Sequence, residues 1–225
     1  FGVAQKEKFR KLKSNLDFLT LTAKPIPRTM QYSFLGLKDF SLIKTPPPKR
    51  QSIKTYVVME DDSIIKNAIE KEVSRGGQVY IVHNRVRDIE QVFSRFQQLV
   101  PNAKMLYAHG QLSEKDLEKR IMDFYQGKYQ VLISTTIIES GIDIPSANTL
   151  IVNNAQTFGL SQLHQLRGRI GRSDKKAYAY LITPRNRILS EVSQKRLKAL
   201  QDYAEIGSGF SIANTDLEIR GAGDI

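Results

Sequence analysis

The octet QLRGRIGR, which begins at Gln165, combines residue types that could act together on a polyphosphate. It places Gln165, Arg169 and Arg172 at spacings of four and three residues, and on one helical turn and its end such residues share a face. Gly168 and Gly171 allow a backbone or a ligand to approach closely between them. Two planar, permanently charged guanidinium groups facing one point indicate arginine-finger chemistry, in which they stabilise charge that grows during phosphoryl transfer. Taken by itself, the octet is also compatible with an exposed basic helix face.

Apolar segments short enough for β-strands alternate with amphipathic segments of helical period from residue 52 onward. Strands are predicted over residues 53–59, 79–83, 104–109, 131–134, 150–153 and 178–182. Helices are predicted over residues 63–75 and 88–99, and from the N-cap Ser113 to Gly127. Near-continuously apolar strands separated by helices predict an α/β fold with a parallel sheet and helices on both faces. Ligands of such sheets gather at the carboxyl ends of strands, where the segments HNR, AHGQ, STTIIESGID and NNAQTFG fall.

The composition along the chain predicts four parts. Residues 1–43 carry a basic start, and residues 44–51 include KTPPPKR, whose prolines predict a stiff linker. Residues 52–185 hold the alternating strands and helices. In residues 186–225 the alternation stops, and we predict a helix over 189–206, a second short helix and a loop.

The charge of the chain is uneven. The net charge is +11, yet residues 1–54 hold 12 Lys and Arg against 3 Asp and Glu, a net charge of +9. A segment this basic attracts a polyanion, most commonly nucleic acid. An exposed helix would show the same pattern, so charge alone does not establish DNA binding.

Composition also bounds metal chemistry and location. The chain has no cysteine and three scattered histidines, which excludes a cysteine-ligated zinc site and argues against a histidine site, so no metal site is predicted. The sequence has no signal peptide and no apolar run of transmembrane length. We therefore expect a soluble protein of the cytoplasm with no membrane partner.

Four segments resemble motifs III to VI of the superfamily 2 helicases and translocases, in the same order along the chain. These are LTLTAKPIPRT at 19–29, GGQVYIVHNRV at 76–86, VLISTTIIESGIDIPSANTLIV at 131–152, and the octet itself. FGLSQLHQLRGRIGRS and the terminal DLEIRGAGDI resemble the double-stranded DNA translocases of this superfamily. GIDIPSANT, AYAYLIT and EIGSGFSIANTDLEIRGAG are most similar to the bacterial branch that couples transcription to repair.

The resemblance implies a role for each matching residue. Arg169, Arg172 and Gln165 would be catalytic, with the arginines acting on the γ-phosphate of ATP. Nucleotide binding is assigned to Glu139, Gly141 and Asp143. Contacts to the DNA backbone are assigned to Thr22, Arg28, Asn84, Arg85, His109, Gly110, Thr135 and Thr136. Coupling of hydrolysis to movement is assigned to Arg220 and Gly221.

Simpler interpretations exist for three of these residues. Asp143 could cap a turn before Pro145, and His109 could be a satisfied histidine at a strand terminus. Arg220 could pair with a nearby carboxylate. Lys24 stands where motif III usually has a small hydroxyl residue, and residues 153–156 lack acidic residues common in relatives.

The 225 residues contain neither a GxxxxGK[ST] phosphate loop nor an acidic DExH-type box. In the superfamily 2 helicases and translocases, which this sequence resembles, both motifs precede motif III. We therefore expect the end of a first motor lobe, a whole second RecA-like lobe (the helicase C-terminal lobe) and a helical hairpin with a loop. ATP with Mg²⁺ is the implied cofactor, the metal being held by the first lobe. The fragment alone should not hydrolyse ATP.

The resemblance also implies partners. Double-stranded DNA would bind this chain, whereas RNA polymerase and excision-repair proteins would bind other domains of the parent protein. Displacement of stalled RNA polymerase is the favoured function. A fork-regressing DNA helicase of the same group is the first alternative, and a non-catalytic DNA-binding module that has lost hydrolysis is the second.

Overall fold

The computed structural model describes residues 41, 52–136, 147–203 and 208–219. Its six strands form one sheet in the order β1-β6-β5-β2-β4-β3, and every neighbouring pair is parallel. The strands are β1 Lys54–Met59, β2 Gln78–Val82, β3 Met105–Ala108, β4 Val131–Ser134, β5 Ala147–Val152 and β6 Tyr178–Thr183. The predicted α/β fold with a parallel sheet is therefore confirmed.

Among the described residues, six α-helices and one 3₁₀ helix connect or follow the strands. They are α3 Asp62–Ser74, α4 Ile89–Leu99, α5 Glu114–Tyr125, η2 Ala155–Thr157, α6 Leu160–Arg167, α7 Glu191–Asp202 and α8 Gly209–Ile219. Side chains cap several of their first turns. The predicted N-cap Ser113 accepts a hydrogen bond from the Asp116 N–H at 3.1 Å, and Ser190 accepts one from the Ser193 N–H at 3.3 Å.

The core lies on both faces of the sheet because successive side chains of a strand point to opposite faces. In β2, Tyr80 and Val82 pack with buried residues of α5, α6, α7 and α8. The alternate residues Val79 and Ile81 pack with α3 and α4. All four are at most 1% exposed, which explains why the strands are apolar at nearly every position.

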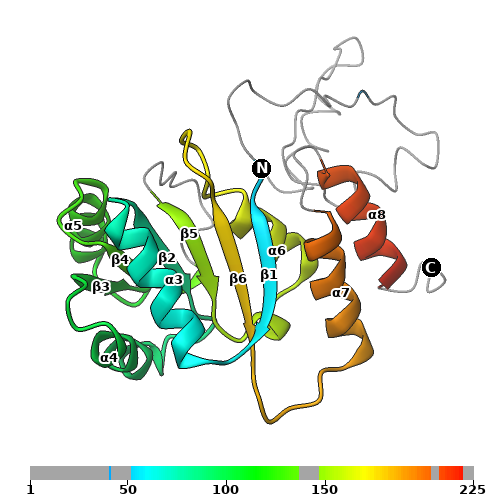
Figure 1. Ribbon diagram of the computed structural model, residues 1–225, viewed down its shortest axis with the longest axis horizontal. Coiled ribbons are helices and arrows are strands. Elements are labelled where there is room, and N and C mark those ends of the chain that lie inside the picture. Colours follow the sequence, from blue (N-terminus) through cyan, green and yellow to red (C-terminus); the bar gives the residue numbers. More distant parts are fainter. Residues whose placement is uncertain (1–40, 42–51, 137–146, 204–207, 220–225) are drawn as a thin grey trace, which may run out of the picture.

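Figure 1 shows how the helices are distributed along the sheet. Helix α7 lies next to β1 at one edge of the sheet, α8 lies beside α7, and both helices contact α6. Helices α4 and α5 lie at the other edge, next to β3. No helix among the described residues is long and apolar enough to cross a membrane.

Two element boundaries differ from the sequence prediction by more than two residues. Strand β5 begins at Ala147 rather than at residue 150. The prediction missed the start of the strand because Asn148 and Thr149 are polar, although both are only 2% exposed. Helix α7 ends at Asp202, inside the predicted helix 189–206. Helix α8 matches the predicted second short helix. Apart from residue 41, the predicted parts 1–43 and 44–51 lie outside the described residues.

Candidate functional site

The catalytic candidates lie at the end of α6 and in the turn that follows it. Gln165 is in the last turn of α6, which ends at Arg167. The interpretation that Gln165, Arg169 and Arg172 share one helical turn and its end needs correction, since both arginines come after the helix. The Gly168 N–H donates to the His164 carbonyl and the Arg169 N–H donates to the Leu166 carbonyl, both at 3.0 Å. A tight turn, rather than a helix face, therefore places the two arginines.

Gly171 shapes this turn. Its φ of +70° falls in the left-handed region, and a Cβ atom added to it would lie 2.8 Å from the Cβ atom of Ala177. Only glycine fits both the conformation and the space. The neighbouring Ile170 is fully buried and anchors the turn to the core. Arg169 is half-buried and Arg172 is exposed, so the Arg172 side chain is open to solvent.

Arg167, in the same octet, has a structural role that its sequence spacing does not reveal. It is 4% exposed, and its Nη1 donates to the Leu200 carbonyl of α7 at 2.8 Å. Its Nη2 lies 3.3 Å from His164 Nδ1 and 3.4 Å from the Ser208 hydroxyl. The guanidinium thus joins α6 to α7 and to the start of α8.

The turn after α6 lies at the amino edge of the sheet, where the strands begin. The Gly171 N–H donates to the carbonyl of Ala147, the first residue of β5, at 3.3 Å. Its neighbours Ala177 and Ile53 directly precede β6 and β1. The arginine candidates are therefore at the amino ends of the strands.

The described DNA-binding candidates lie at the opposite, carboxyl edge, as predicted from the strand ends. Asn84 and Arg85 follow β2, His109 and Gly110 follow β3, and Thr135 and Thr136 follow β4. Because strands of four to six residues rise about 3.3 Å per residue, the two edges lie roughly 13–20 Å apart. The structure thus separates the two predicted groups of residues.

Exposure differs among the candidates of the carboxyl edge. Asn84, Arg85 and Gly110 are exposed and Thr136 is half-buried. Thr135 is 3% exposed, and its hydroxyl has no hydrogen-bond partner in the described part of the chain. A contact from the Thr135 hydroxyl to a phosphate would therefore require the covering residues to move.

His109 is half-buried against Tyr107. The two rings stack with centroids 6.0 Å apart and planes 6° apart. Arg120 covers the Tyr107 ring at 4.7 Å and donates to the Tyr107 carbonyl at 2.7 Å. This packing fixes the direction in which His109 leaves β3.

A buried histidine, His83, joins two loops of the carboxyl edge and was not among the predicted site residues. Its Nε2 lies 3.0 Å from Asp88 Oδ1 and its Nδ1 lies 3.1 Å from Asn153 Nδ2. Because the Asn153 amide nitrogen can only donate, Nδ1 accepts and Nε2 donates to Asp88. Asn84 Nδ2 adds a second link to the Thr157 hydroxyl at 3.2 Å. The loop with Asn84 and Arg85 is thereby fixed to the loop after β5.

The His83 contact also affects Asp88. Partial burial acts to raise the pKa of the Asp88 carboxyl, but the hydrogen bond from His83, a backbone hydrogen bond and the charge of Arg85 together outweigh it. The net result is a lowered pKa. Asp88 therefore stays ionised and keeps its acceptor for His83.

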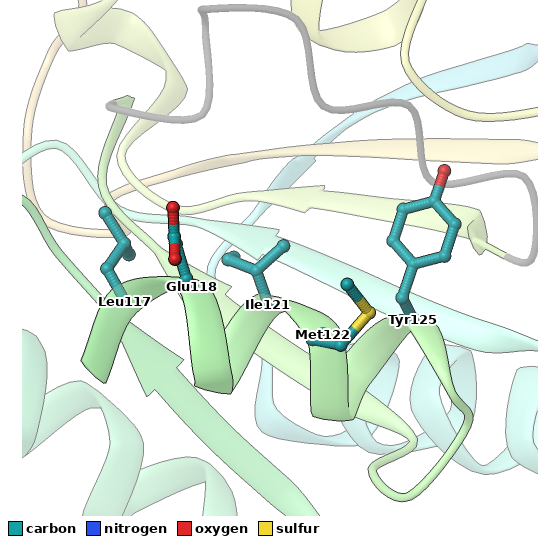
Figure 2. A pocket seen from close by; sticks show the side chains of 5 residues that line it. All are labelled: Leu117, Glu118, Ile121, Met122 and Tyr125. Atoms are coloured by element: carbon teal, nitrogen blue, oxygen red, sulfur yellow. The ribbon is translucent and has the colours of Figure 1, made fainter. Parts of the chain in front are cut away.

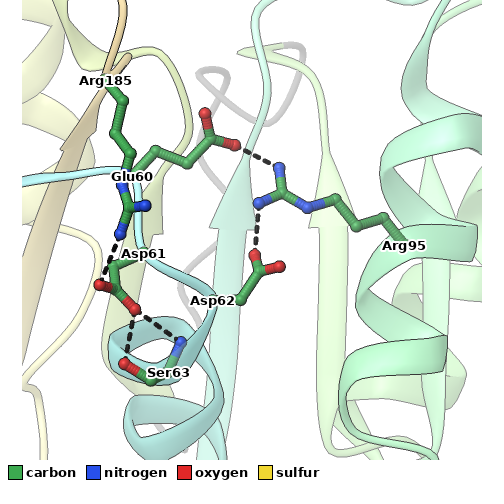
Figure 3. Close-up of polar contacts among 6 residues, drawn as sticks. All are labelled: Glu60, Asp61, Asp62, Ser63, Arg95 and Arg185. Carbon is green, nitrogen blue, oxygen red and sulfur yellow. Dashed lines mark hydrogen bonds and ion pairs between the residues drawn. The ribbon is translucent and has the colours of Figure 1, made fainter.

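The part of the carboxyl edge next to β1 is acidic and internally paired. In Figure 3, Arg95 of α4 forms ion pairs with Glu60 and Asp62, and Arg185 reaches Asp61 at 2.8 Å. Asp61 also accepts from the Ser63 N–H at 2.8 Å and caps α3. Carboxylates repel phosphate, so this corner is unsuited to the DNA backbone. The basic and amide candidates occupy the other part of the edge.

Helix α5 presents a separate apolar hollow of about 500 Å³. Figure 2 shows its five lining side chains on one side of the helix: Leu117, Glu118, Ile121, Met122 and Tyr125. One carboxylate and one phenol hydroxyl among three apolar side chains offer little for catalysis. Within the described ranges, no group of three or more His, Cys, Asp or Glu side chains could hold a metal ion.

Seven predicted site residues lie outside the described residues. They are Thr22, Arg28, Glu139, Gly141, Asp143, Arg220 and Gly221.

The parallel sheet and the QLRGRIGR turn agree with a known domain class. Residues 61–174 match the family described as the helicase conserved C-terminal domain, and the chain belongs to this family. Transcription-repair-coupling factors are similar to it along its whole length. The Bacillus subtilis protein is 53% identical and the Myxococcus xanthus protein 54% identical over all 225 residues. The chain spans about a fifth of these curated relatives, 19% of each.

A solved structure supports the same assignment. RecG bound to a three-way DNA junction matches 94% of this chain, which covers 30% of the RecG chain, with a TM-score of 0.74 and 34% identity. The fold is thus a RecA-like helicase C-terminal lobe. The resemblance to double-stranded DNA translocases, and within them to the repair-coupling branch, is confirmed at the level of sequence similarity.

Proposed function

We propose that this chain is the second motor lobe of an ATP-dependent translocase on double-stranded DNA that displaces stalled RNA polymerase and couples transcription to nucleotide excision repair. One observation carries the proposal. Gln165, Arg169 and Arg172 lie at the amino edge of the sheet, and the described DNA candidates lie at the carboxyl edge. A motor lobe needs two such separate surfaces, one for nucleotide and one for its track.

On the nucleotide side, Arg169 and Arg172 would stabilise the charge that develops on the γ-phosphate. Arginine fingers of this kind accelerate hydrolysis by about three to five orders of magnitude. Gln165 would connect the turn to the nucleotide cleft, and Glu139, Gly141 and Asp143 would contribute to nucleotide binding. The phosphate loop and the Mg²⁺ ligands would belong to a first lobe, so this chain alone would not hydrolyse ATP.

On the DNA side, the contacts would be to the backbone. Asn84, Arg85 and Thr136 offer amide, guanidinium and hydroxyl groups that suit phosphate oxygens and carry no base readout. Movement along DNA needs this indifference to sequence. His109, Gly110, Thr135, Thr22 and Arg28 complete the proposed DNA-binding set. Arg220 and Gly221 would couple lobe closure to movement.

Two other functions remain as alternatives. The TM-score of 0.74 to RecG favours fork regression as the second candidate, but the identity to RecG is 34%, against 53% to a transcription-repair-coupling factor. A non-catalytic DNA-binding module would have no use for the arginines of the amino edge. We expect RNA polymerase and repair proteins to bind other parts of the full-length protein, in the bacterial cytoplasm.

The test compares wild-type and Arg172→Ala forms of the full-length protein. DNA-stimulated ATP hydrolysis should fall at least about 1,000-fold while the dissociation constant for ATP changes little, because a finger acts on transition-state charge. Unchanged hydrolysis in both Arg172→Ala and a matching Arg169→Ala variant would show that this lobe supplies no arginine finger. Release of stalled RNA polymerase, against regression of a model fork, then separates the two translocase functions.

A further inference from the structure

The two residues on either side of Arg172 are hydrogen-bonded to the first two residues of β5. The Gly171 N–H donates to the Ala147 carbonyl at 3.3 Å. The Ser173 hydroxyl donates to Asn148 Oδ1 at 2.8 Å. Arg172 lies between these two contacts, so β5 fixes its Cα atom while its side chain remains exposed.

Asn148 is a firm anchor for this contact. It is 2% exposed and is the residue of β5 at which the register with β2 shifts. It directly precedes Thr149, from which β5 is paired with β2 on one side and with β6 on the other. A strand held from both sides cannot shift without breaking ladder hydrogen bonds. The Ser173 hydroxyl also accepts from the Lys175 N–H at 3.3 Å, which orients it toward Asn148.

A third contact attaches the same loop to α3. Lys175 Nζ donates to the carbonyl of Arg75, the C-cap of α3, at 3.0 Å. Arg75 forms an ion pair with Glu72, and Glu72 accepts a hydrogen bond from the Thr149 hydroxyl of β5. Helix α3 and β5 are thus joined to each other as well as to the loop.

We propose that Asn148, acting through Ser173, is the positioning residue of Arg172. This inference rests on the proposed finger role of Arg172 and adds the group that holds it. A long arginine side chain has many rotamers, so a fixed Cα atom is needed before its guanidinium can meet a phosphate at the required place. A misplacement of about 1 Å can cost about 100-fold in rate.

The test uses Ser173, which is half-buried, because Ser173→Ala removes a single oxygen atom and leaves no large cavity. Full-length protein is prepared as Ser173→Ala, Ser173→Thr, Arg172→Ala and the Ser173→Ala/Arg172→Ala double variant. Ser94→Ala is the matched control, since its hydroxyl bonds within α4 to the Glu90 carbonyl, away from the turn. Single-turnover hydrolysis at high protein concentration measures even the slow variants, ATP binding is titrated, and thermal unfolding reports on the fold.

The expected pattern has three parts. Ser173→Ala lowers the hydrolysis rate about 10- to 100-fold with ATP affinity and unfolding temperature unchanged. Ser173→Thr, which keeps the hydroxyl, retains the wild-type rate, as does Ser94→Ala. In the Arg172→Ala background, Ser173→Ala has no further effect, because the group that it positions is gone.

The outcomes that overturn the inference differ from those that overturn the function. A Ser173→Ala rate equal to wild type, or an equal loss in both backgrounds, contradicts the positioning role and leaves the finger role of Arg172 intact. Wild-type rates in both Arg172→Ala and Arg169→Ala contradict the proposed function itself.

Discussion

The Nδ1 atom of His83 lies 3.1 Å from the Nδ2 atom of Asn153, and this contact joins the loops that follow β2 and β5. Both residues come one position after neighbouring strands that pair Val82 with Val152. The amide donates, so the second imidazole nitrogen is protonated and donates to Asp88. The orientation of the Arg85 loop therefore depends on a buried imidazole that is held by a hydrogen bond at each of its two ring nitrogens.

Asp88 should make a pH-dependent contribution to stability. Its pKa is lowered in the folded state, so its contribution is complete above the unfolded pKa of about 3.9 and is lost as pH falls through the folded pKa. Asp88→Asn keeps the acceptor and removes the charge. Urea unfolding at pH 7 should show a loss of no more than about 1 kcal/mol, since the side chain is 31% exposed. The difference from wild type should vanish toward pH 2, and a constant difference would assign the effect to packing.

Gly171→Ala should destabilise the fold more than Gly127→Ala. Both glycines have positive φ, +70° and +74°, but a Cβ atom at Gly127 meets nothing within 4 Å. Gly127→Ala should therefore cost only backbone strain, about 1 kcal/mol. Gly171→Ala adds the clash with Ala177 and should cost about 2–4 kcal/mol. Chemical denaturation measures both, and equal losses would rule out the steric part.

Thr149→Val should destabilise the fold, because it removes a hydrogen-bond donor from the buried Glu72 carboxylate. Glu72 is 1% exposed, accepts from the Thr149 hydroxyl, and has a second oxygen without a hydrogen-bond partner in the described part of the chain. Removing that donor should lower the free energy of unfolding by about 1–3 kcal/mol. Thr149→Ser retains the donor and should lose less. If Val and Ser variants were equally stable, the hydroxyl would contribute nothing.

Arg85→Ala should weaken binding of this chain to duplex DNA. One phosphate contact is lost, so the slope of log affinity against log salt concentration should decrease by about one, equally for unrelated sequences. Arg185→Ala is the control, because Arg185 pairs with Asp61 in the acidic corner. Filter binding or anisotropy over a salt series gives both slopes. An effect of Arg185→Ala as large as that of Arg85→Ala would mean that only net charge matters.

Local patterns predicted elements well where one residue decides the outcome. Ser113 was expected as an N-cap, and its hydroxyl accepts from the Asp116 N–H. Val131 to Ser134 was expected as a strand and is β4. The start of β5 was missed because Asn148 and Thr149 are polar, and only their neighbours in the sheet make burial favourable.

The candidate site was proposed from the sequence as a set of segments, and the sequence did not predict how these segments are arranged in space. Arg167 and Arg169 look alike in the octet, yet Arg167 is buried against α7 and Arg169 lies in the turn. Which arginine is structural depends on where α6 ends. Likewise, the contact between His83 and Asn153, 70 residues apart, follows from strand register, which no local pattern specifies.

The separation of the two candidate surfaces has a mechanical consequence. The strands between them are buried on both faces, and a close-packed interior has low compressibility. A displacement of the turn that carries Arg172 therefore cannot be taken up by deformation of the sheet. It must rotate or translate the whole lobe as a rigid body. The length of that body, set by a few residues of β4 and β5, would fix how far the DNA-facing loops swing for a given closure at the nucleotide.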